Sequence, residues 1–175
     1  MTAQKNRGRR VVAAAALAML SLGVTSCGAI NEQATTFQYA ASDGIVLNVG
    51  ALEVRNLMLV TKSATDKARL IGSVVNSTDK PATLDLTLAS GSVSIKVPAK
   101  SVLNLEKPEN EKTVPSAGVL PGAQAKATLA VGSGSQDVGI PVVDGTLEEY
   151  REYVPGGFDP KGLEHLTPSE KPAAH

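Results

Sequence analysis

The sequence predicts an all-β fold, an antiparallel β-sandwich of seven or eight short strands followed by a short helix and a disordered tail. Between residues 44 and 143, short runs rich in Val, Ile, Leu and Thr recur at intervals of about ten residues. Gly, Pro, Asn or Asp bounds each run, and no long helical pattern lies between them. We therefore expect one folded domain over residues 44–145, a sandwich of the Ig-like or cupredoxin-like type.

Alternation of apolar and polar residues supports several of these strands. Over residues 83–88 the apolar residues fall on alternate positions, which buries one face of a strand and leaves the other in water. We interpret residues 70–76 in the same way. Pro141 lacks a backbone N–H group and therefore predicts an edge position for the last strand. The expected strands are 45–49, 52–60, 68–76, 82–89, 92–97, 102–105, 123–131 and 137–143.

A mixed-charge segment over residues 106–114 interrupts this pattern. Its charged side chains are Glu106, Lys107, Glu109, Glu111 and Lys112. Such a run is normally solvated. We therefore expect a connection between strands here, with no catalytic role.

Residues 1–26 are predicted to be an export signal. A basic head of Lys5, Arg7, Arg9 and Arg10 precedes an apolar run over residues 11–24. The run has 14 residues, whereas a membrane-spanning helix needs about 20, and the positive charge lies only on its N-terminal side. These are the features of a secretory signal peptide that is removed from the mature protein.

The signal ends in Val24-Thr25-Ser26-Cys27, which resembles the lipobox of bacterial lipoproteins. The resemblance implies that Cys27 receives a diacylglyceryl group and that cleavage occurs before it. Acyl chains such as palmitate would then hold the protein at the extracytoplasmic face of the cell membrane. Only a thiol among these side chains is a good nucleophile near neutral pH, and two acyl chains suffice for stable anchoring. The alternative is an ordinary secretory signal with an incidental cysteine.

The mature chain would keep 149 of the 175 residues, enough for one domain with tails. Loss of the basic head leaves 13 Lys and Arg against 17 Asp and Glu, a net charge of −4 that gives no electrostatic reason to bind nucleic acid. Cys27 is the only cysteine and Trp is absent, so the core must be aliphatic and free of disulfides. Residues 27–43 are small and polar and predict a flexible tether.

Residues 146–155 predict a short helix. Thr146 and Glu149 have the spacing of a capping box, and Pro155 ends the segment. Four side chains at helical spacing are expected to pack on the sandwich: Leu147, Tyr150, Tyr153 and Val154. Residues 156–175 are rich in Pro, Gly and charged residues and predict the disordered tail.

No catalytic site is predicted. A hydrolytic triad needs a His beside a nucleophile and an acid, but both histidines, His165 and His175, lie in the expected tail, outside any rigid scaffold. No Gly-rich phosphate-binding loop follows a strand and opens a helix, so we expect no cofactor. We therefore predict that the protein is not an enzyme.

Three motifs carry a resemblance to a known family. They are LEVRNLM over residues 52–58, the strand and polar turn ARLIGSVVNSTDKP over residues 68–81, and VLPG over residues 119–122. Together with the lipobox, these motifs make the chain similar to the LpqE-type lipoproteins of actinobacteria, which are related to the PCu(A)C copper chaperones. The resemblance implies the sandwich fold and a partner among membrane proteins, with a respiratory complex as one candidate.

The PCu(A)C family binds Cu(I) through Met and His side chains, because soft thioether and imidazole ligands suit that ion. In this chain the expected folded segment has one methionine, Met58, and no histidine. One thioether does not make a Cu(I) site, and Met58 lies in an apolar run where it suits core packing. We therefore expect the fold of the family without its metal site, and Met58, His165 and His175 are only weak metal candidates.

These observations predict a membrane-anchored, non-catalytic accessory or protein-interaction module that contacts an envelope or membrane protein. The alternative is copper handling of the PCu(A)C type, with Met58 and the two histidines as ligands. A hydrolase or another enzyme has the least support.

Overall fold

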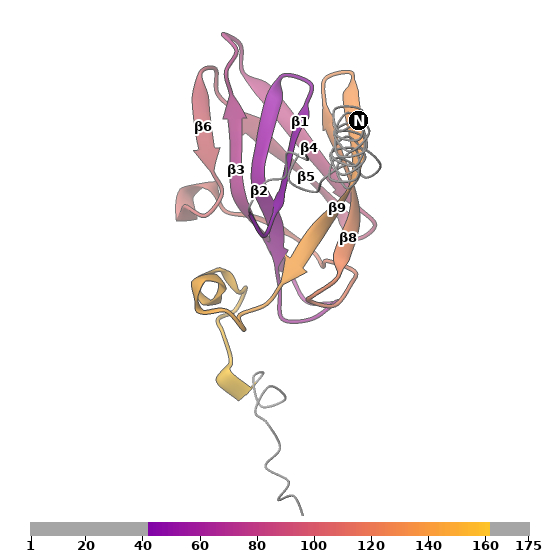
Figure 1. The fold of residues 1–175 in the computed structure, drawn as a ribbon, viewed down its shortest axis with the longest axis vertical. Coiled ribbons are helices and arrows are strands. Elements are labelled where there is room, and N and C mark those ends of the chain that lie inside the picture. The colour runs from indigo at the N-terminus through magenta and orange to yellow at the C-terminus, as the bar shows by residue number, and fades with distance from the viewer. Residues whose placement is uncertain (1–41, 162–175) are drawn as a thin grey trace, which may run out of the picture. The chain divides into compact units, whose positions relative to one another are not determined.

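The computed structural model describes residues 42–161 (Figure 1). This part of the chain is built mainly of strands, which confirms the predicted all-β fold. The strands are β1 (Ile45–Val49), β2 (Leu52–Val60), β3 (Ala68–Asn76), β4 (Ala82–Leu88), β5 (Gly91–Val97), β6 (Ser101–Asn104), β7 (Lys112–Val114), β8 (Gln124–Val131) and β9 (Gly134–Val143). Two 3-10 helices among the described residues are η2 (Pro108–Asn110) and η3 (Glu148–Tyr153).

The strands form two layers, which we call sheet A and sheet B. Sheet A holds β1, β2, β3, β6 and β7, with β2 and β3 paired at its centre. Sheet B has the order β5-β4-β8-β9, and its neighbours are antiparallel. The C-terminal end of β9 also pairs with β2 in parallel, through Leu59 with Val142 and Val60 with Val143. The ladder is therefore continuous from one layer to the other (Figure 1).

The expectation that Pro141 places the last strand at an edge is wrong, because β9 lies between β8 and β2. Val142 N donates to Ala123 O at 2.9 Å, and Val142 O accepts from Gly122 N at 2.8 Å. Since backbone polar groups alternate sides along a strand, the nitrogen of Pro141 faces the opposite side, toward β2. Pairing with β2 begins only at Val142. The missing N–H group thus falls just before that ladder, where proline is tolerated.

The mixed-charge segment contains a strand that the sequence did not predict. β7 pairs with β3 in an antiparallel register, with Val114 opposite Ala68 and Lys112 opposite Leu70. Val114 is buried with 2% exposure. The expectation of a solvated connection is wrong for residues 112–114. Their sequence has no alternation of its own, and hydrogen bonding to β3 holds them in a strand.

Aliphatic side chains fill the space between the two sheets. The buried residues of this main core are all Val, Leu, Ile or Ala, as the composition predicted. Leu57, Leu84, Leu86 and Leu129 are among its fully buried members. Each such side chain contributes about 1.5–3 kcal/mol through removal from water, so aliphatic burial is the main force that holds the sheets together.

A bulge at Asn56 divides β2. Asn56 has φ 53°, and the pairing with β3 shifts between Arg55 and Met58. Both neighbouring segments supply a glycine at the bulge. A Cβ atom on Gly72 would lie 2.4 Å from Asn56 O, and one on Gly44 would lie 2.4 Å from Asn56 C. Gly44 N also donates to Asn56 Oδ1 at 2.8 Å, which fixes the asparagine in place.

Beyond the bulge, β2 is buried on both faces. Leu57 and Leu59 belong to the main core. Met58 and Val60 belong to a second cluster, which residues of the segment 144–158 complete. We call this segment the strap. Its buried members in the cluster are Tyr150 and Val154, which contact β2 and β3 residues as predicted for the C-terminal segment.

The predicted short helix is present as η3, but its capping differs from the prediction. Leu147 occupies the N-cap with extended backbone angles, φ −79° and ψ 137°, and no side chain caps the helix. The capping box expected from Thr146 and Glu149 is therefore wrong. Thr146 N instead donates to Asp144 Oδ1 at 2.8 Å. Leu147 is 51% exposed and does not join the second cluster, contrary to expectation.

None of the helices within residues 42–161 is long and apolar enough to span a bilayer. The predicted signal, the lipidation site, most of the tether and the tail from residue 162 lie outside the described residues.

Candidate functional site

Met58 is the predicted metal candidate that falls within the described residues. Its side chain is fully buried, with 0% exposure, and packs with Val60, Ile71, Tyr150 and Val154. A flexible thioether is well suited to fill the irregular space between such groups. The other predicted site residues lie outside the described residues: Val24, Thr25, Ser26, Cys27, His165 and His175.

Acidic and metal-ligating side chains are dispersed in the described domain. Within residues 42–161, no group of three or more His, Cys, Asp or Glu side chains is placed to hold a metal ion.

Arg69 forms a buried polar site that the sequence analysis missed. It is 9% exposed and lies on β3 with Ile71, on the face that the strap covers. Its Nη2 donates to Glu106 O at 2.8 Å, and its Nη1 lies 3.7 Å from Glu111 Oε2. Its guanidinium carbon lies 5.0 Å from the centre of the Tyr153 ring, a cation–π contact. Arg69 Nε is buried without a hydrogen-bond partner.

The sequence held one signal for this site. Arg69 interrupts the apolar run Ala68, Leu70 and Ile71, and alternation places it on the same face of β3 as Ile71. A charged residue on a face that is otherwise apolar indicates either an exposed sheet face or a buried site with partners. The second case applies here, because the strap covers that face.

Two tyrosines of the strap face this region, and both phenols are held in the protonated state. Burial, together with the hydrogen bond to Asp43, raises the pKa of Tyr150 to about 12. Burial, together with the neighbouring Glu152, raises the pKa of Tyr153 to about 12. Tyr150 Oη donates to Asp43 Oδ2 at 2.5 Å. Tyr150 therefore remains a hydrogen-bond donor to Asp43 even at mildly alkaline pH.

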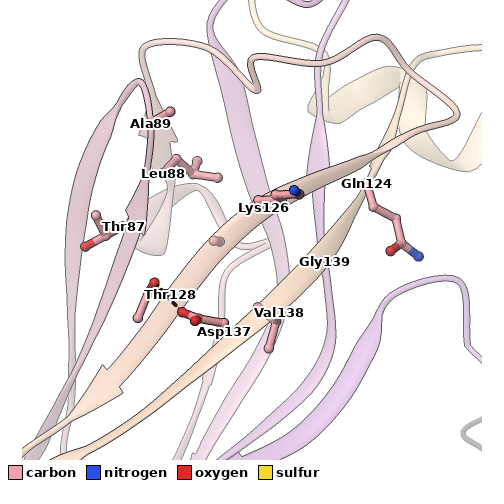
Figure 2. A pocket seen from close by; sticks show the side chains of 10 residues that line it. Thr87, Leu88, Ala89, Gln124, Lys126, Thr128, Asp137, Val138 and Gly139 are labelled. Carbon is pink, nitrogen blue, oxygen red and sulfur yellow. Dashed lines mark hydrogen bonds between the residues drawn. The ribbon is translucent and has the colours of Figure 1, made fainter.

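An open groove of about 760 Å³ lies on sheet B, across the end of β4, the first half of β8 and the middle of β9 (Figure 2). Thr87, Lys126 and Asp137 are among the side chains along it. Thr128 Oγ1 donates to Asp137 Oδ1 at 2.7 Å, so this carboxylate is already engaged. The groove offers polar groups for hydrogen bonding, but its lining contains no His or Cys that could act as a nucleophile or its base.

A smaller groove of about 280 Å³ lies where β9 runs into the strap. Pro121, Val142, Val143, Leu147 and Tyr150 are among its lining residues. Leu147 on this lining is 51% exposed. Leu120, which precedes Pro121 in the chain, is 66% exposed. We call the surface formed by the two exposed leucines and this groove the leucine surface.

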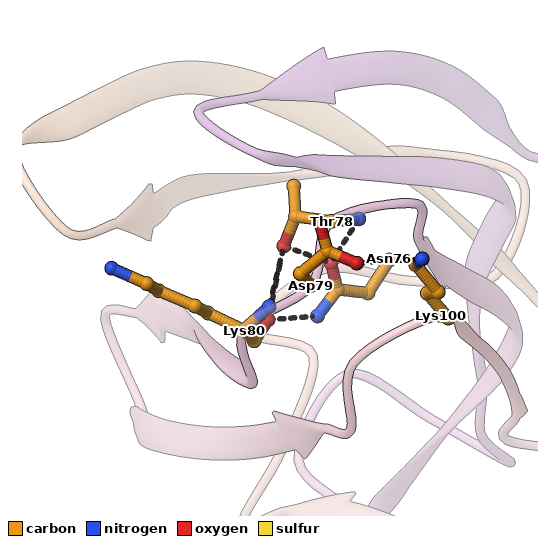
Figure 3. A network of polar contacts seen from close by, with 5 residues as sticks. All are labelled: Asn76, Thr78, Asp79, Lys80 and Lys100. Atoms are coloured by element: carbon orange, nitrogen blue, oxygen red, sulfur yellow. Dashed lines mark hydrogen bonds and ion pairs between the residues drawn. The ribbon is translucent and has the colours of Figure 1, made fainter.

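A polar network holds the turn between β3 and β4 (Figure 3). Asn76 Nδ2 donates to Lys80 O at 2.9 Å and to Val97 O at 3.2 Å, and its Oδ1 accepts from Thr78 N at 3.0 Å. Asp79 and Lys100 form an exposed ion pair with 2.6 Å between Oδ1 and Nζ. The buried amide satisfies backbone groups, so this network has a structural role in fixing the turn.

No family model matches this chain, and no curated protein matches it. The similar solved structures include two PCuAC domains. The copper-bound PCuAC domain from PmoF2 has 21% identity and a TM-score of 0.44, over 57% of this chain and 98% of that domain. The apo PCuAC domain from PmoF1 has 16% identity and a TM-score of 0.46, over 57% of this chain and 99% of that domain.

Both structural neighbours are PCuAC domains, the class whose fold the sequence motifs resemble. At these identities the likeness concerns the fold alone.

Proposed function

We propose that this protein is a lipid-anchored, non-catalytic accessory module that binds another envelope or membrane protein. The leucine surface is the observation that carries this proposal. Leu147 is 51% exposed and lines the groove with Val142 and Val143. Leu120 is 66% exposed and directly precedes Pro121, which also lines the groove. Exposed apolar groups that gather around a groove commonly mark a protein-binding surface.

Covering this surface would supply only part of the energy of a specific contact, because association itself costs about 4–15 kcal/mol and the rest must come from further contacts with the partner. Full burial of a leucine is worth about 1.5–3 kcal/mol, so the exposed parts of Leu120 and Leu147 together offer about 2–3 kcal/mol. The groove adds a shaped, mainly apolar recess for a side chain of the partner. A membrane protein of a respiratory complex is the candidate partner that the LpqE-type resemblance suggests.

The proposed location rests on the sequence motif at Cys27. Acylation of this thiol, with cleavage before it, would place the domain at the extracytoplasmic face of the membrane. Labelling of cells with radioactive palmitate tests this step, and we expect label in the native protein and none in a Cys27→Ala variant. A Cys27→Ala protein that sediments with membranes like the native protein would contradict the anchor.

Crosslinking in living cells tests the binding surface. A photoreactive amino acid at position 120 should yield a defined adduct with one envelope protein, identified by mass spectrometry. Val102 on the short strand β6 provides a matched control, because it is 65% exposed and also apolar. We expect no equivalent adduct from position 102. The same adducts from both positions, or none from position 120, would remove the leucine surface as the basis of the function.

Copper handling by Met58, His165 and His175 is the second candidate, and the name of one similar solved structure, the PCuAC domain from PmoF2, mentions bound copper. Met58 is fully buried, so an ion could reach its sulfur only after the strap moves. Titration of the full chain with Cu(I) decides between the candidates. The accessory role predicts no binding tighter than a micromolar dissociation constant, about −8 kcal/mol.

A further inference from the structure

The strap covers an apolar face of sheet A but is attached to it by few polar contacts. Within the described residues, the backbone hydrogen bonds of the strap are internal to it, as from Tyr150 N to Leu147 O at 3.2 Å and from Val154 N to Arg151 O at 3.3 Å. Strands that belong to the sheets are held instead by continuous ladders. Segments without such ladders open at lower free energy than the core.

Side chains provide the contacts between the strap and the rest of the domain. Tyr150 Oη donates to Asp43, and Lys62 Nζ lies 3.4 Å from Gly156 O. Tyr153 lies over Arg69. The remaining attachment is apolar packing on Met58, Val60 and Ile71.

The covered state leaves one strong donor without an acceptor. Arg69 Nε is buried and unpartnered, although Nη2 of the same guanidinium reaches Glu106 O. The paired carboxylate oxygen, Glu111 Oε2, is 3.7 Å from Nη1, beyond hydrogen-bond length. A buried donor without an acceptor is costly. A segment that replaced the strap and offered an acceptor to Nε would therefore fit this face better than the strap does.

We propose that the face formed by Met58, Val60, Ile71 and Arg69 is a second docking site, which the strap occupies until a partner segment displaces it. The matching segment carries an aromatic side chain for the position of Tyr153 and a carboxylate that accepts from Arg69 Nε. This inference rests on the proposed interaction function and extends it. The leucine surface is continuous with this site, because Leu147 and Tyr150 of the strap line its groove.

A partner bound at the leucine surface would contact the start of the strap directly. Displacement exposes the apolar groups of the docking face, which the partner covers in turn. It also exposes Tyr150 and Val154 of the strap, so the partner must offset their exposure as well. The partner segment gains over the strap by offering an acceptor to Arg69 Nε, which has no partner while the strap covers the face. This arrangement confines the second site to partners that combine an aromatic group with an acidic group.

Competition by a peptide in trans tests the site. The probe is a fluorescent peptide with the sequence of residues 146–158 and the substitution Tyr150→Phe, so that its own affinity does not depend on Asp43. It is added to the full-length protein in detergent. Asp43→Ala removes the acceptor of Tyr150 without altering the docking face, so it should raise the population of open strap. We expect the peptide to bind this variant about tenfold more tightly than it binds the native protein, since apparent affinity scales with the open fraction.

Asp79→Ala is the matched control, because it also removes one exposed carboxylate from a polar contact, in the turn between β3 and β4. We expect native peptide affinity in this variant. A second peptide, with serine at positions 150 and 153, should not bind Asp43→Ala. This control changes only the peptide and uses the same protein variant. Arg69→Leu in the Asp43→Ala background should weaken binding of the first, fluorescent peptide, because it removes the contact of Arg69 with Tyr153.

Three results would overturn the proposal. They are equal affinity for the native protein and Asp43→Ala, equal binding of the serine peptide, and absence of saturable binding. None of these results would contradict the proposed role of the leucine surface, because that role is tested separately by crosslinking from position 120. Loss of the position 120 adducts with retained peptide binding would instead contradict the proposed function alone.

Discussion

Tyr150 Oη donates a hydrogen bond to Asp43 Oδ2 at 2.5 Å, although the two residues are 107 positions apart in the chain. Asp43 lies just before β1, and Tyr150 lies in η3 of the strap. The bond therefore joins the segment that leads into the sandwich to the segment that leaves it. It also holds Tyr150 over Met58, Val60 and Ile71.

Removal of this hydrogen bond should loosen the strap and destabilise the domain moderately. Tyr150→Phe keeps the buried ring but loses the hydroxyl, and Asp43 is exposed enough to recover water. We expect a loss of about 1 kcal/mol in the free energy of unfolding, measured in urea. Tyr153→Phe is the control, with a smaller loss because its main contact is the ring over Arg69. Equal losses in the two variants would contradict the role of Asp43.

The same tyrosine should make stability fall at alkaline pH. The pKa of Tyr150 is about 12 in the folded protein, mainly through burial, against about 10 in the unfolded chain. A pKa raised by folding stabilises the protein fully below pH 10 and less and less as the pH rises toward 12. Urea midpoints measured across this range should therefore fall more steeply for the native protein than for Tyr150→Phe. Parallel curves would contradict the shift.

The glycine beside the Asn56 bulge should not tolerate a side chain. Gly72 has φ 113°, and a Cβ atom there would lie 2.4 Å from Asn56 O, which is backbone. We expect Gly72→Ala to cost about 3 kcal/mol through the clash and the strained backbone. Gly118→Ala provides the control, because Gly118 has φ 72° but no atom within 4 Å of its Cβ position, and it should cost about 1 kcal/mol. Similar urea midpoints for the two variants would show that the bulge can relax.

Short apolar runs bounded by turn residues, several of them alternating, were sufficient to predict most of the strands. β1, β2 and β3 have the predicted bounds, and the bounds of β4 and β5 differ from prediction by one residue at one end. These strands carry their own pattern, since one face meets an aliphatic core. β7 has no such pattern in Lys112-Thr113-Val114 and depends on β3 for its pairing. Pairing between distant segments is not encoded in the local sequence, which is why β7 was missed.

The position of β9 could not be predicted for a related reason. The sequence shows that the N–H group of Pro141 is missing, but it does not show which neighbouring strand that group would have faced. In β9 that side faces β2 just before their ladder begins at Val142. Pro141 does lack a backbone donor, as the prediction assumed. It does not place β9 at an edge, because β9 pairs with β8 on one side and, from Val142, with β2 on the other.

The buried polar site was harder to predict than the fold. Arg69 is buried because Tyr153 and the backbone of Glu106 approach it from segments 84 and 37 positions away in the chain. Neither contact has a local signal in the sequence. By contrast, the apolar and aromatic spacing of the strap predicted the packing of Tyr150, Tyr153 and Val154, although Leu147 is exposed and the expected capping box is absent.

Substitutions at Met58 separate a packing role from a role as a metal ligand. Met58 is fully buried beside Val60, Ile71 and Tyr150. Met58→Leu keeps the volume but removes the sulfur, and we expect it to cost less than about 1.5 kcal/mol, whereas Met58→Ala should cost about 2–5 kcal/mol by leaving a cavity. Urea unfolding of the three proteins measures these differences. If packing is the role of Met58, the leucine variant retains position 120 adducts and its response to Cu(I) is unchanged. Loss of tight Cu(I) binding in Met58→Leu, with stability retained, would instead favour copper handling over the accessory role.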